Sequence, residues 1–320
     1  MKILFVTATR IGDAVLSTGL LHYLVARYPD ARFTIVAGPV AAPLFEAVPT
    51  LERIIPVAKR PYSLHWLELY RGIALIHWDL VVDLRRSALS FILPAKRRHV
   101  IDKGDLGEHR VRQLGRLFDL DPPPSPYLWS TLRHEREAAN LISDGSNLLA
   151  LGPTANWGAK QWRASRFAEL ARRLSAPGAI LSGARILVMA AAHERPQILP
   201  ILNAFPPEQI IDLVGKIGLL TAAAVLRRAA LFVGNDNGLM HIAAAVGTPT
   251  LGLFGPSPPE RYAPWGSHTA VAATAIPYRT LVTAPDYDYR KQETLMDSLS
   301  VDAVEESARR LWRRIAGIAA

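Results

Sequence analysis

The chain has 320 residues, half of them hydrophobic and a fifth charged, which is the composition of an ordinary globular protein with two domains. It contains no cysteine, so disulfides and thiolate metal sites are excluded. The net charge of +9 favours acidic partners: nucleic acid, anionic lipid or phosphorylated sugar. Nucleic acid is the least favoured of the three, because no zinc-finger or RNA-binding signature occurs.

The first half of the chain alternates short apolar runs with helical patterns. The apolar runs predict strands at residues 2–7, 32–37, 53–57 and 79–83, and the helical patterns predict helices at 14–28, 66–76, 87–93 and 108–118. Arg10 and Asp13 interrupt the first apolar stretch too early for a signal peptide. Because strands buried on both faces read as continuous apolar runs, the pattern predicts a parallel sheet covered by helices.

The proline-rich stretch Asp121–Pro126 fits neither a helix nor a central strand. We place the linker between this stretch and Asn147, so the expected domains are residues 1–146 and 147–320. The second series of strands is expected at residues 148–152, 185–190, 210–214, 231–233 and 249–254, with helices at 165–174, 196–204, 219–228, 239–246 and 301–315. The predicted fold is α/β, with two Rossmann-like domains whose parallel sheets face each other across a cleft.

No apolar run reaches the ~18–20 residues that a transmembrane helix needs. The expected location is therefore the cytoplasm. The basic clusters, such as 96–99, favour a peripheral contact with an anionic membrane face.

Residues 231–258 form the most informative stretch, a predicted strand–turn–helix–strand unit. Its first turn is Gly234-Asn235-Asp236-Asn237-Gly238, and the N-terminus of the helix that follows favours a phosphate group. A second turn, Gly255-Pro256-Ser257-Pro258, follows the next strand. For the first turn alone the plainer interpretation is preferred: Asp236 and Asn237 cap a helix, and His241 is an interior histidine.

Three other positions carry candidate chemistry. Asp13 lies between the first strand and helix, where it is either a helix cap or a catalytic base projecting into the cleft. Lys160, close to Trp157 and Trp162, is either a surface lysine over packed aromatic rings or a ligand to a phosphate. Asp212 ends a predicted strand, where it is either a ribose ligand or a solvated carboxylate.

The sequence gives little support for a metal-binding site. Two Asp-x-Asp matches, Asp119/Asp121 and Asp286/Asp288, lie in proline-flanked loops without the strand context that such sites require. The remaining histidines show no ligand spacing. We therefore predict no metal and no cofactor.

The stretch from Asp236 to Pro258 resembles the donor-site signature of glycosyltransferase family 9, the lipopolysaccharide heptosyltransferases. The matching residues are Asp236, Gly238, His241, Ala244, Pro249, Gly255, Pro256, Ser257 and Pro258. The Arg10–Asp13 loop and the Lys160 element also match, in the same order and with similar spacing. Asn237 stands where the family has a hydroxyl residue, and Arg163 where proline is commoner.

The resemblance implies a GT-B fold whose last helix, 301–316, packs back on the first domain. It implies an inverting, metal-independent transfer of heptose from ADP-heptose to the lipopolysaccharide inner core at the inner membrane, with Asp13 as general base. The donor site that it implies, together with the residues nearby, comprises Thr154, Asn156, Lys160, Asp212, Asp236, Asn237, Gly238, His241 and Ser257. Two alternatives stay open: the same fold with a different nucleotide sugar, or a non-catalytic module that binds nucleotide sugars.

Overall fold

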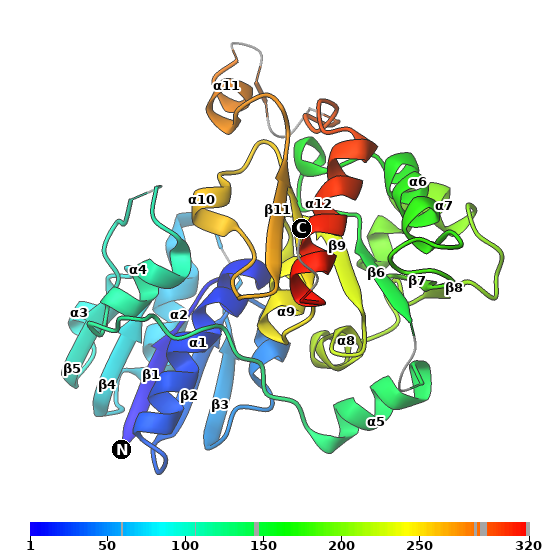
Figure 1. The fold of residues 1–320 in the computed structure, drawn as a ribbon. Coiled ribbons are helices and arrows are strands. Elements are labelled where there is room, and N and C mark those ends of the chain that lie inside the picture. The colour runs from blue at the N-terminus through cyan, green and yellow to red at the C-terminus, as the bar shows by residue number, and fades with distance from the viewer. Residues whose placement is uncertain (59, 106, 144–146, 285–286, 289–292, 318–320) are drawn as a thin grey trace. The chain divides into compact units, whose positions relative to one another are not determined.

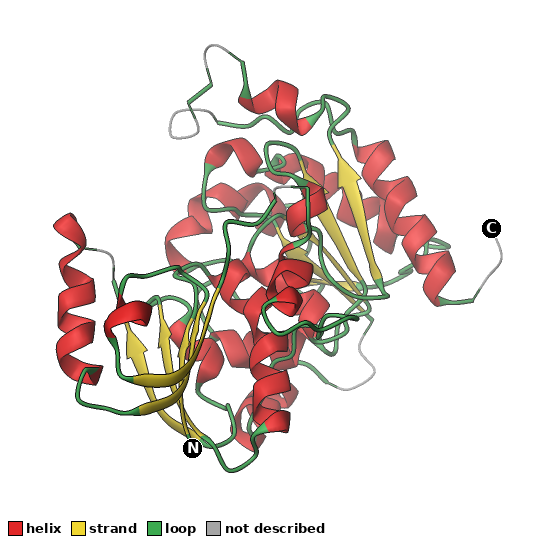
Figure 2. Ribbon diagram, turned by 90° about the vertical axis from the view of Figure 1, so that its left-hand side faces the viewer, coloured by secondary structure: helices red, strands yellow, loops and turns green. Residues whose placement is uncertain are grey.

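The computed structural model describes residues 1–58, 60–105, 107–143, 147–284, 287–288 and 293–317. These residues form two compact units, Met1–Thr131 and Leu132–Ala320. Each unit contains one parallel β-sheet with helices packed on its faces (Figures 1 and 2). The prediction of two α/β units with parallel sheets is confirmed.

The first unit holds a five-stranded sheet, here called sheet A, in the order β3-β2-β1-β4-β5. The strands are β1 (Lys2–Val6), β2 (Arg32–Ala37), β3 (Leu51–Pro56), β4 (Trp78–Asp83) and β5 (Ala95–Val100). The helices are α1 (Ile11–Arg27), η1 (Ala42–Phe45), η2 (Pro61–Ser63), α2 (Leu64–Ile73), α3 (Leu89–Ile92) and α4 (Arg110–Arg116). Helices α2 and α3 share one core cluster with the sheet, and α1 packs against α4.

The second unit holds a six-stranded sheet, here called sheet B, in the order β11-β10-β9-β6-β7-β8. The strands are β6 (Leu148–Gly152), β7 (Arg185–Val188), β8 (Ile210–Asp212), β9 (Leu231–Asn235), β10 (Thr250–Phe254) and β11 (Thr269–Ala273). The helices are α5 (Leu132–Leu141), η3 (Gly158–Lys160), α6 (Ala164–Ser175), η4 (Ala192–Glu194), α7 (Arg195–Leu202), α8 (Leu219–Leu226), α9 (Gly238–Ala245), α10 (Pro259–Tyr262), α11 (Tyr278–Val282) and α12 (Val301–Ile315).

The sequence missed β5 and β11, both of which lie at the edge of a sheet. Half of the residues of β5, AKRRHV, are charged, and those of β11, TAVAA, are small. An edge strand has a neighbour on one side only and tolerates polar or small residues, so it lacks the continuous apolar signal of a central strand.

The two units divide between Thr131 and Leu132, whereas the sequence placed the boundary at residues 146 and 147. The difference is helix α5, which packs against α8 of the second unit. The proline-rich stretch is held on the first unit, because the Tyr127 amide donates to Thr18 Oγ1 at 3.0 Å and the Tyr127 ring stacks on His22. Packing, rather than composition, sets the boundary here.

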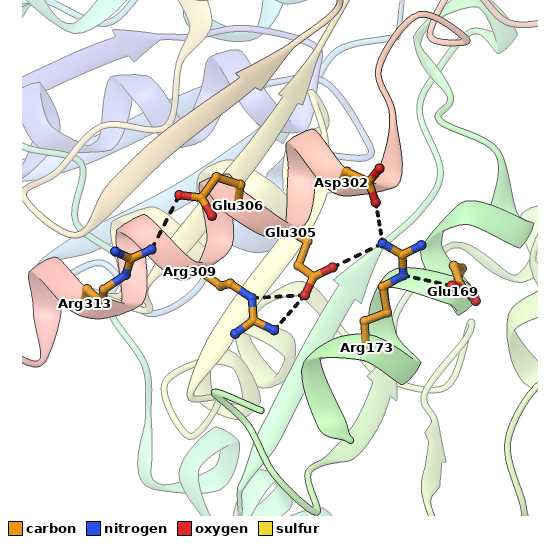
Figure 3. A network of polar contacts seen from close by, with 7 residues as sticks. All are labelled: Glu169, Arg173, Asp302, Glu305, Glu306, Arg309 and Arg313. Carbon is orange, nitrogen blue, oxygen red and sulfur yellow. Dashed lines mark hydrogen bonds and ion pairs between the residues drawn. The ribbon is translucent and has the colours of Figure 1, made fainter. Parts of the chain in front are cut away.

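The terminal helix α12 packs within the second unit against α6, β10 and β11. Figure 3 shows the ion-pair network on its surface, in which Arg173 of α6 donates to Glu169, Asp302 and Glu305. Hydrogen bonds to these three carboxylates raise the pKa of Arg173 further above its ordinary value. Beside the network, the Trp162 indole donates to Leu299 O at 2.8 Å. The expected packing of α12 on the first domain stays a prediction.

Within the described part of the chain, none of the helices combines the length and the apolar character needed to cross a membrane.

Three glycines lie in register across the centre of sheet B. Gly234 of β9 pairs with Gly152 of β6 on one side and with Gly252 of β10 on the other. A Cβ atom at Gly234 would lie 2.7 Å from the Phe232 ring and 2.9 Å from Gly152 O. The absence of side chains therefore lets Phe232 and the neighbouring backbone pack closely just before the strands end.

We expect Gly234→Ala to lower the free energy of unfolding by about 1–3 kcal/mol, the usual cost of overpacking a tight core. Gly72→Ala is the matched control, because Gly72 lies in α2 and a Cβ atom there meets nothing within 4 Å. Alanine favours helices, so the control should be neutral or stabilising. Thermal melts of both variants check this, and an unchanged melting temperature for Gly234→Ala would contradict the close-packing argument.

Candidate active site

The carboxyl edge of sheet B gathers most of the predicted donor-site residues. The neighbouring strands β6, β9 and β10 end at Gly152, Asn235 and Phe254, and the loops after them carry Lys160, Asp236 and Ser257. In parallel sheets, the loops at this edge are where ligands bind. The structure therefore brings together, within one unit, residues that lie up to about a hundred positions apart.

The centre of this edge is an ion pair between Lys160 Nζ and Asp236 Oδ2, both almost fully buried. His241 Nε2 lies 3.7 Å from the other carboxylate oxygen. Burial alone raises the pKa of Asp236, but His241 and Lys160 outweigh burial and hold it well below its ordinary value. Asp236 is therefore a carboxylate that fixes the Lys160 ammonium at the edge of the sheet.

Lys160 also lies over the ring of Trp157, with Nζ 5.1 Å from the ring centroid. The surface-lysine interpretation is wrong, because Lys160 is paired and largely enclosed and Trp162 is part of the core. A compact ammonium held in this way can bind an anionic oxygen.

Asn237 forms the start of helix α9. Its side-chain oxygen accepts from Met240 N at 2.9 Å, and its side-chain nitrogen donates to Thr154 O at 2.7 Å and Gly152 O at 3.3 Å. The helix-cap interpretation of Asn237 is confirmed. Its predicted contact with the donor stays a prediction, since the amide already has three protein partners.

Asn235 was missed by the sequence analysis. This residue is completely buried, and its amide donates to Pro153 O at 2.7 Å and accepts from Trp162 N at 3.1 Å. Asn235 and Asn237 thus tie the loop that carries Lys160 to the strand that leads to Asp236. The sequence feature that could have identified it is an asparagine at the end of an apolar strand, because a buried side-chain amide must form hydrogen bonds with other residues.

Thr154 and Asn156 lie in the loop after β6. The Thr154 hydroxyl is buried and donates to Glu194 Oε2 at 2.9 Å. Glu194 Oε2 also accepts a hydrogen bond from Ala191 N at 2.8 Å. Asn156 is exposed. Glu194 is a second residue that the sequence analysis missed, and it links this loop to the one after β7.

Asp212 lies apart from the Lys160–Asp236 pair, at the end of edge strand β8 and separated from β6 by β7. It accepts from Arg195 at 2.6 Å and from Val214 N at 3.1 Å, and Lys216 Nζ lies 3.4 Å away. Burial alone raises the pKa of Asp212, but these partners lower it below its ordinary value. Asp212 is therefore a paired carboxylate, and its contact with a ribose stays a prediction.

Gly238 is the first residue of α9, and Ser257 lies in the turn after β10. Ser257 Oγ and His241 Nδ1 are enclosed polar atoms that find no hydrogen-bond partner among the described residues. Unpaired buried polar atoms are rare in folded proteins, and a ligand is one of the partners that satisfies them. Both atoms belong to the loops and the helix that carry the predicted donor site.

In the first unit, Asp13 lies in the first turn of α1, because this helix begins at Ile11, three residues earlier than predicted. The N-cap residue is Arg10, so the cap interpretation of Asp13 is wrong. The Asp13 side chain is partly exposed and has no hydrogen bond or ion pair with any other described residue. Its carboxylate is free to meet a ligand at the carboxyl edge of sheet A.

Asp83, which ends the neighbouring strand β4, provides a contrast. It is fully buried and accepts from Arg85 N and Ser87 N, both at 2.7 Å, and from the hydroxyls of Ser87 and Ser90. These hydrogen bonds hold the loop after β4 around the Asp83 carboxylate. Of these two carboxylates, only Asp13 is available for chemistry.

Two further basic groups of the first unit were missed by the sequence analysis. His65 Nδ1 accepts from Arg60 N at 3.2 Å, which places the ring proton on Nε2, and Arg85 lies over the Trp66 ring at 4.6 Å. Burial lowers the pKa of Arg85 below its ordinary value. His65 Nε2 and Arg85 Nη1 are enclosed, with no partner among the described residues. They are two N–H donors suited to an anion.

Among the described residues, no three His, Asp or Glu side chains gather in a group that could hold a metal ion. Asp119 and Asp121 are exposed in the loop after α4. Asp286, of the second Asp-x-Asp match, lies outside the described residues.

We expect Asn237→Thr to be less stable than the parent protein by about 1–2 kcal/mol. Threonine can still cap α9, but it removes the two donated bonds to Gly152 O and Thr154 O, and each such bond contributes about 1 kcal/mol. Urea titration measures the change. An unchanged midpoint would mean that these bonds do not stabilise the loop.

Three comparisons with known proteins agree. The family model of glycosyltransferase family 9 (heptosyltransferase) matches residues 83–284. The chain is 28% identical to lipopolysaccharide heptosyltransferase 2 of Salmonella typhimurium, in a match that covers 96% of this chain and 97% of that protein. It is 23% identical to lipopolysaccharide heptosyltransferase 3 of Escherichia coli, in a match that covers 87% of this chain and 90% of that protein. The solved structure of E. coli ADP-heptose lipopolysaccharide heptosyltransferase II superimposes with a TM-score of 0.74 at 23% identity, covering 99% of this chain and all of that one. This likeness confirms the predicted GT-B type of fold.

Proposed function

Because this chain belongs to glycosyltransferase family 9, we propose that it transfers heptose from ADP-heptose to the inner core of a lipopolysaccharide-type acceptor. The observation that carries the proposal is the Lys160–Asp236 pair with His241, formed by the residues of the family motif at the carboxyl edge of sheet B. The relatives named as heptosyltransferases match over nearly their whole length, which supports the same activity.

In the proposed reaction, the second unit binds the donor. The Lys160 ammonium contacts the pyrophosphate, and the Ser257 hydroxyl and the first amides of α9, beginning at Gly238, add hydrogen bonds to it. These donors stabilise the negative charge that develops on ADP as the glycosidic bond breaks. No metal or cofactor takes part in this mechanism.

The first unit supplies the base. The Asp13 carboxylate takes the proton from an acceptor hydroxyl, whose oxygen attacks the anomeric carbon of heptose as the bond to ADP breaks. A single displacement inverts the configuration at that carbon. Among the described residues Asp13 has no partner, which supports this role, since a base must be free to bind the substrate hydroxyl.

The acceptor in this proposal is an anionic glycan carried at the inner face of the inner membrane. Enclosed donors of the first unit, His65 Nε2 and Arg85 Nη1, suit a phosphate or carboxylate group of such an acceptor. The relatives include lipopolysaccharide heptosyltransferases named 2 and 3. The first alternative is the same reaction with a different nucleotide sugar.

A panel of nucleotide sugars, tested with and without a lipopolysaccharide-core acceptor, distinguishes these functions. We expect release of ADP from ADP-heptose only when the acceptor is present, and equal turnover in EDTA. Turnover with another nucleotide sugar alone would establish the alternative. Binding without turnover would favour a non-catalytic module, and a loss of activity in EDTA that magnesium restores would contradict the metal-independent mechanism.

Lys160→Ala should weaken ADP binding by about 10- to 100-fold, because a hydrogen bond from a charged group contributes about 1.5–3 kcal/mol. Calorimetry with ADP measures the effect. Asp236→Asn is the control, since it breaks the same buried ion pair but keeps the ammonium. If both variants lose ADP affinity equally, the loss reflects disruption of the site rather than the charge of Lys160.

Asp13→Asn should lower kcat by about 10²–10⁴-fold, the usual contribution of a general base, with nearly unchanged donor affinity and melting temperature. Asp30→Asn is the matched control, because Asp30 is exposed just before β2, at the amino edge of the same sheet. Normal turnover of Asp13→Asn in a steady-state assay would remove Asp13 from the mechanism.

A further inference from the structure

Residues 294–299, which lie just before α12, form a segment that we call the bridging segment. It is hydrogen-bonded to the loop after β6, which carries Lys160. Leu295 N donates to the carbonyl of the residue before Lys160 at 2.9 Å, and the Thr294 hydroxyl donates to the carbonyl of the residue after it at 2.6 Å. The backbone on both sides of Lys160 is therefore held by a segment that comes much later in the chain.

An ion pair extends this contact to Arg163. Its guanidinium donates to both carboxylate oxygens of Asp297, each at 2.6 Å. Arg166 donates to the backbone carbonyls of Asp297 and Leu299, at 2.9 and 2.7 Å. The hydrogen bonds from Arg163 hold the pKa of Asp297 below its ordinary value, so this carboxylate is ionised at neutral pH. A pair with two parallel hydrogen bonds fixes the orientation of both side chains as well as their separation.

The ion pair holds Arg163 at a point where the backbone changes direction. Arg163 is the N-cap residue of α6, three positions after Lys160, and its φ is −58°. A proline ring would fix nearly the same angle, about −65°, through its covalent structure. Proline is also the commoner residue at this position of the family element that the sequence resembles. In this chain an ion pair with Asp297 stands where a ring would fix the angle.

The bridging segment also reaches the turn that carries Ser257. Met296 is buried in the core of the second unit. A Cβ atom at Gly255, the first residue of that turn, would overlap Met296 Sδ and would lie 3.7 Å from Leu295 O. Gly255 therefore leaves room for Met296. The segment that is hydrogen-bonded to the Lys160 loop on one side packs against the Ser257 turn on the other.

We propose that the bridging segment positions the two side-chain groups of the proposed pyrophosphate site, the Lys160 ammonium and the Ser257 hydroxyl, with Asp297 as a positioning residue. The inference rests on the proposed function, because it concerns the same site. A group that is held in place before the ligand arrives loses less conformational entropy on binding, so a weaker hold lowers the affinity for the ligand. Arg163 and Asp297 are each about half exposed, and such pairs contribute little to global stability. The effect should therefore appear in affinity rather than in the melting temperature.

The first test measures the Kd of ADP by calorimetry for Asp297→Asn, which keeps the size of the side chain but removes its charge. We expect the Kd to rise about fivefold, the upper range for the loss of an exposed ion pair, with a nearly unchanged melting temperature. Asp302→Asn is the matched control, because Asp302 pairs with Arg173 in the last turn of α6. The control should bind ADP as the parent does. An unchanged Kd for Asp297→Asn, or an equal rise in the control, would overturn the proposal.

Two variants of Arg163 separate positioning from a direct contact between its side chain and the ligand. Arg163→Ala and Arg163→Pro both remove the guanidinium, but proline restores the backbone angle. We expect Arg163→Ala to weaken ADP binding as Asp297→Asn does, and Arg163→Pro to bind ADP as the parent does. Equally weak binding by both variants would overturn the positioning role, since the Arg163 side chain itself would then be required.

The Lys160→Ala variant distinguishes failure of this inference from failure of the proposed function. If the parent binds ADP and Lys160→Ala weakens the binding while the Asp297 and Arg163 variants do not, the proposed function stands and the positioning role is wrong. If the parent does not bind ADP, both are wrong.

Discussion

The candidate donor site depends on one buried ion pair, between Lys160 and Asp236. Enclosing two opposite charges costs solvation free energy, and their attraction compensates only when the geometry is held closely. The surrounding structure supplies that geometry, because the strand order of sheet B places β6 directly beside β9. The pair is therefore a product of the fold: removing Asp236 would take the carboxylate partner from Lys160, and removing Lys160 would leave Asp236 with His241 beside it.

The asparagines on each side of Asp236 explain why the pair keeps its geometry. Asn235 joins the end of β9 to Pro153 and Trp162, and Asn237 joins the start of α9 to the carbonyls of Gly152 and Thr154. Short polar side chains thus replace backbone pairing just where the two strands end. The glycines before them leave room for the Phe232 ring and, at Gly152, for the Asn237 side chain. The loops that carry the chemistry are consequently fixed before any ligand binds, which lowers the entropy lost on binding.

The first unit shows how two similar residues acquire different roles. Asp13 and Asp83 both lie at the carboxyl edge of sheet A, yet Asp83 is saturated with donors while Asp13 has no partner among the described residues. The sequence places Asp83 at the end of an apolar run and Asp13 in the loop that matches the family motif, but it does not show which carboxylate has hydrogen-bond partners. His65 and Arg85 are a similar case, because the sequence does not show that His65 Nε2 and Arg85 Nη1 are enclosed beside Trp66 without a partner among the described residues.

The alternation of strands and helices, the two parallel sheets and the family motif from Asp236 to Pro258 can be predicted from the sequence, because continuous apolar runs and glycine–proline turns are local signals. Even the limits of the last helix, Val301–Ile315, follow from its amphipathic pattern. The three-dimensional packing was needed to find the unit boundary at Thr131, the edge strands β5 and β11, and the partners of Lys160, Asp212 and Asn237. Those features arise from contacts between residues far apart in the chain, and burial and hydrogen-bond partners are properties of such contacts rather than of any single stretch.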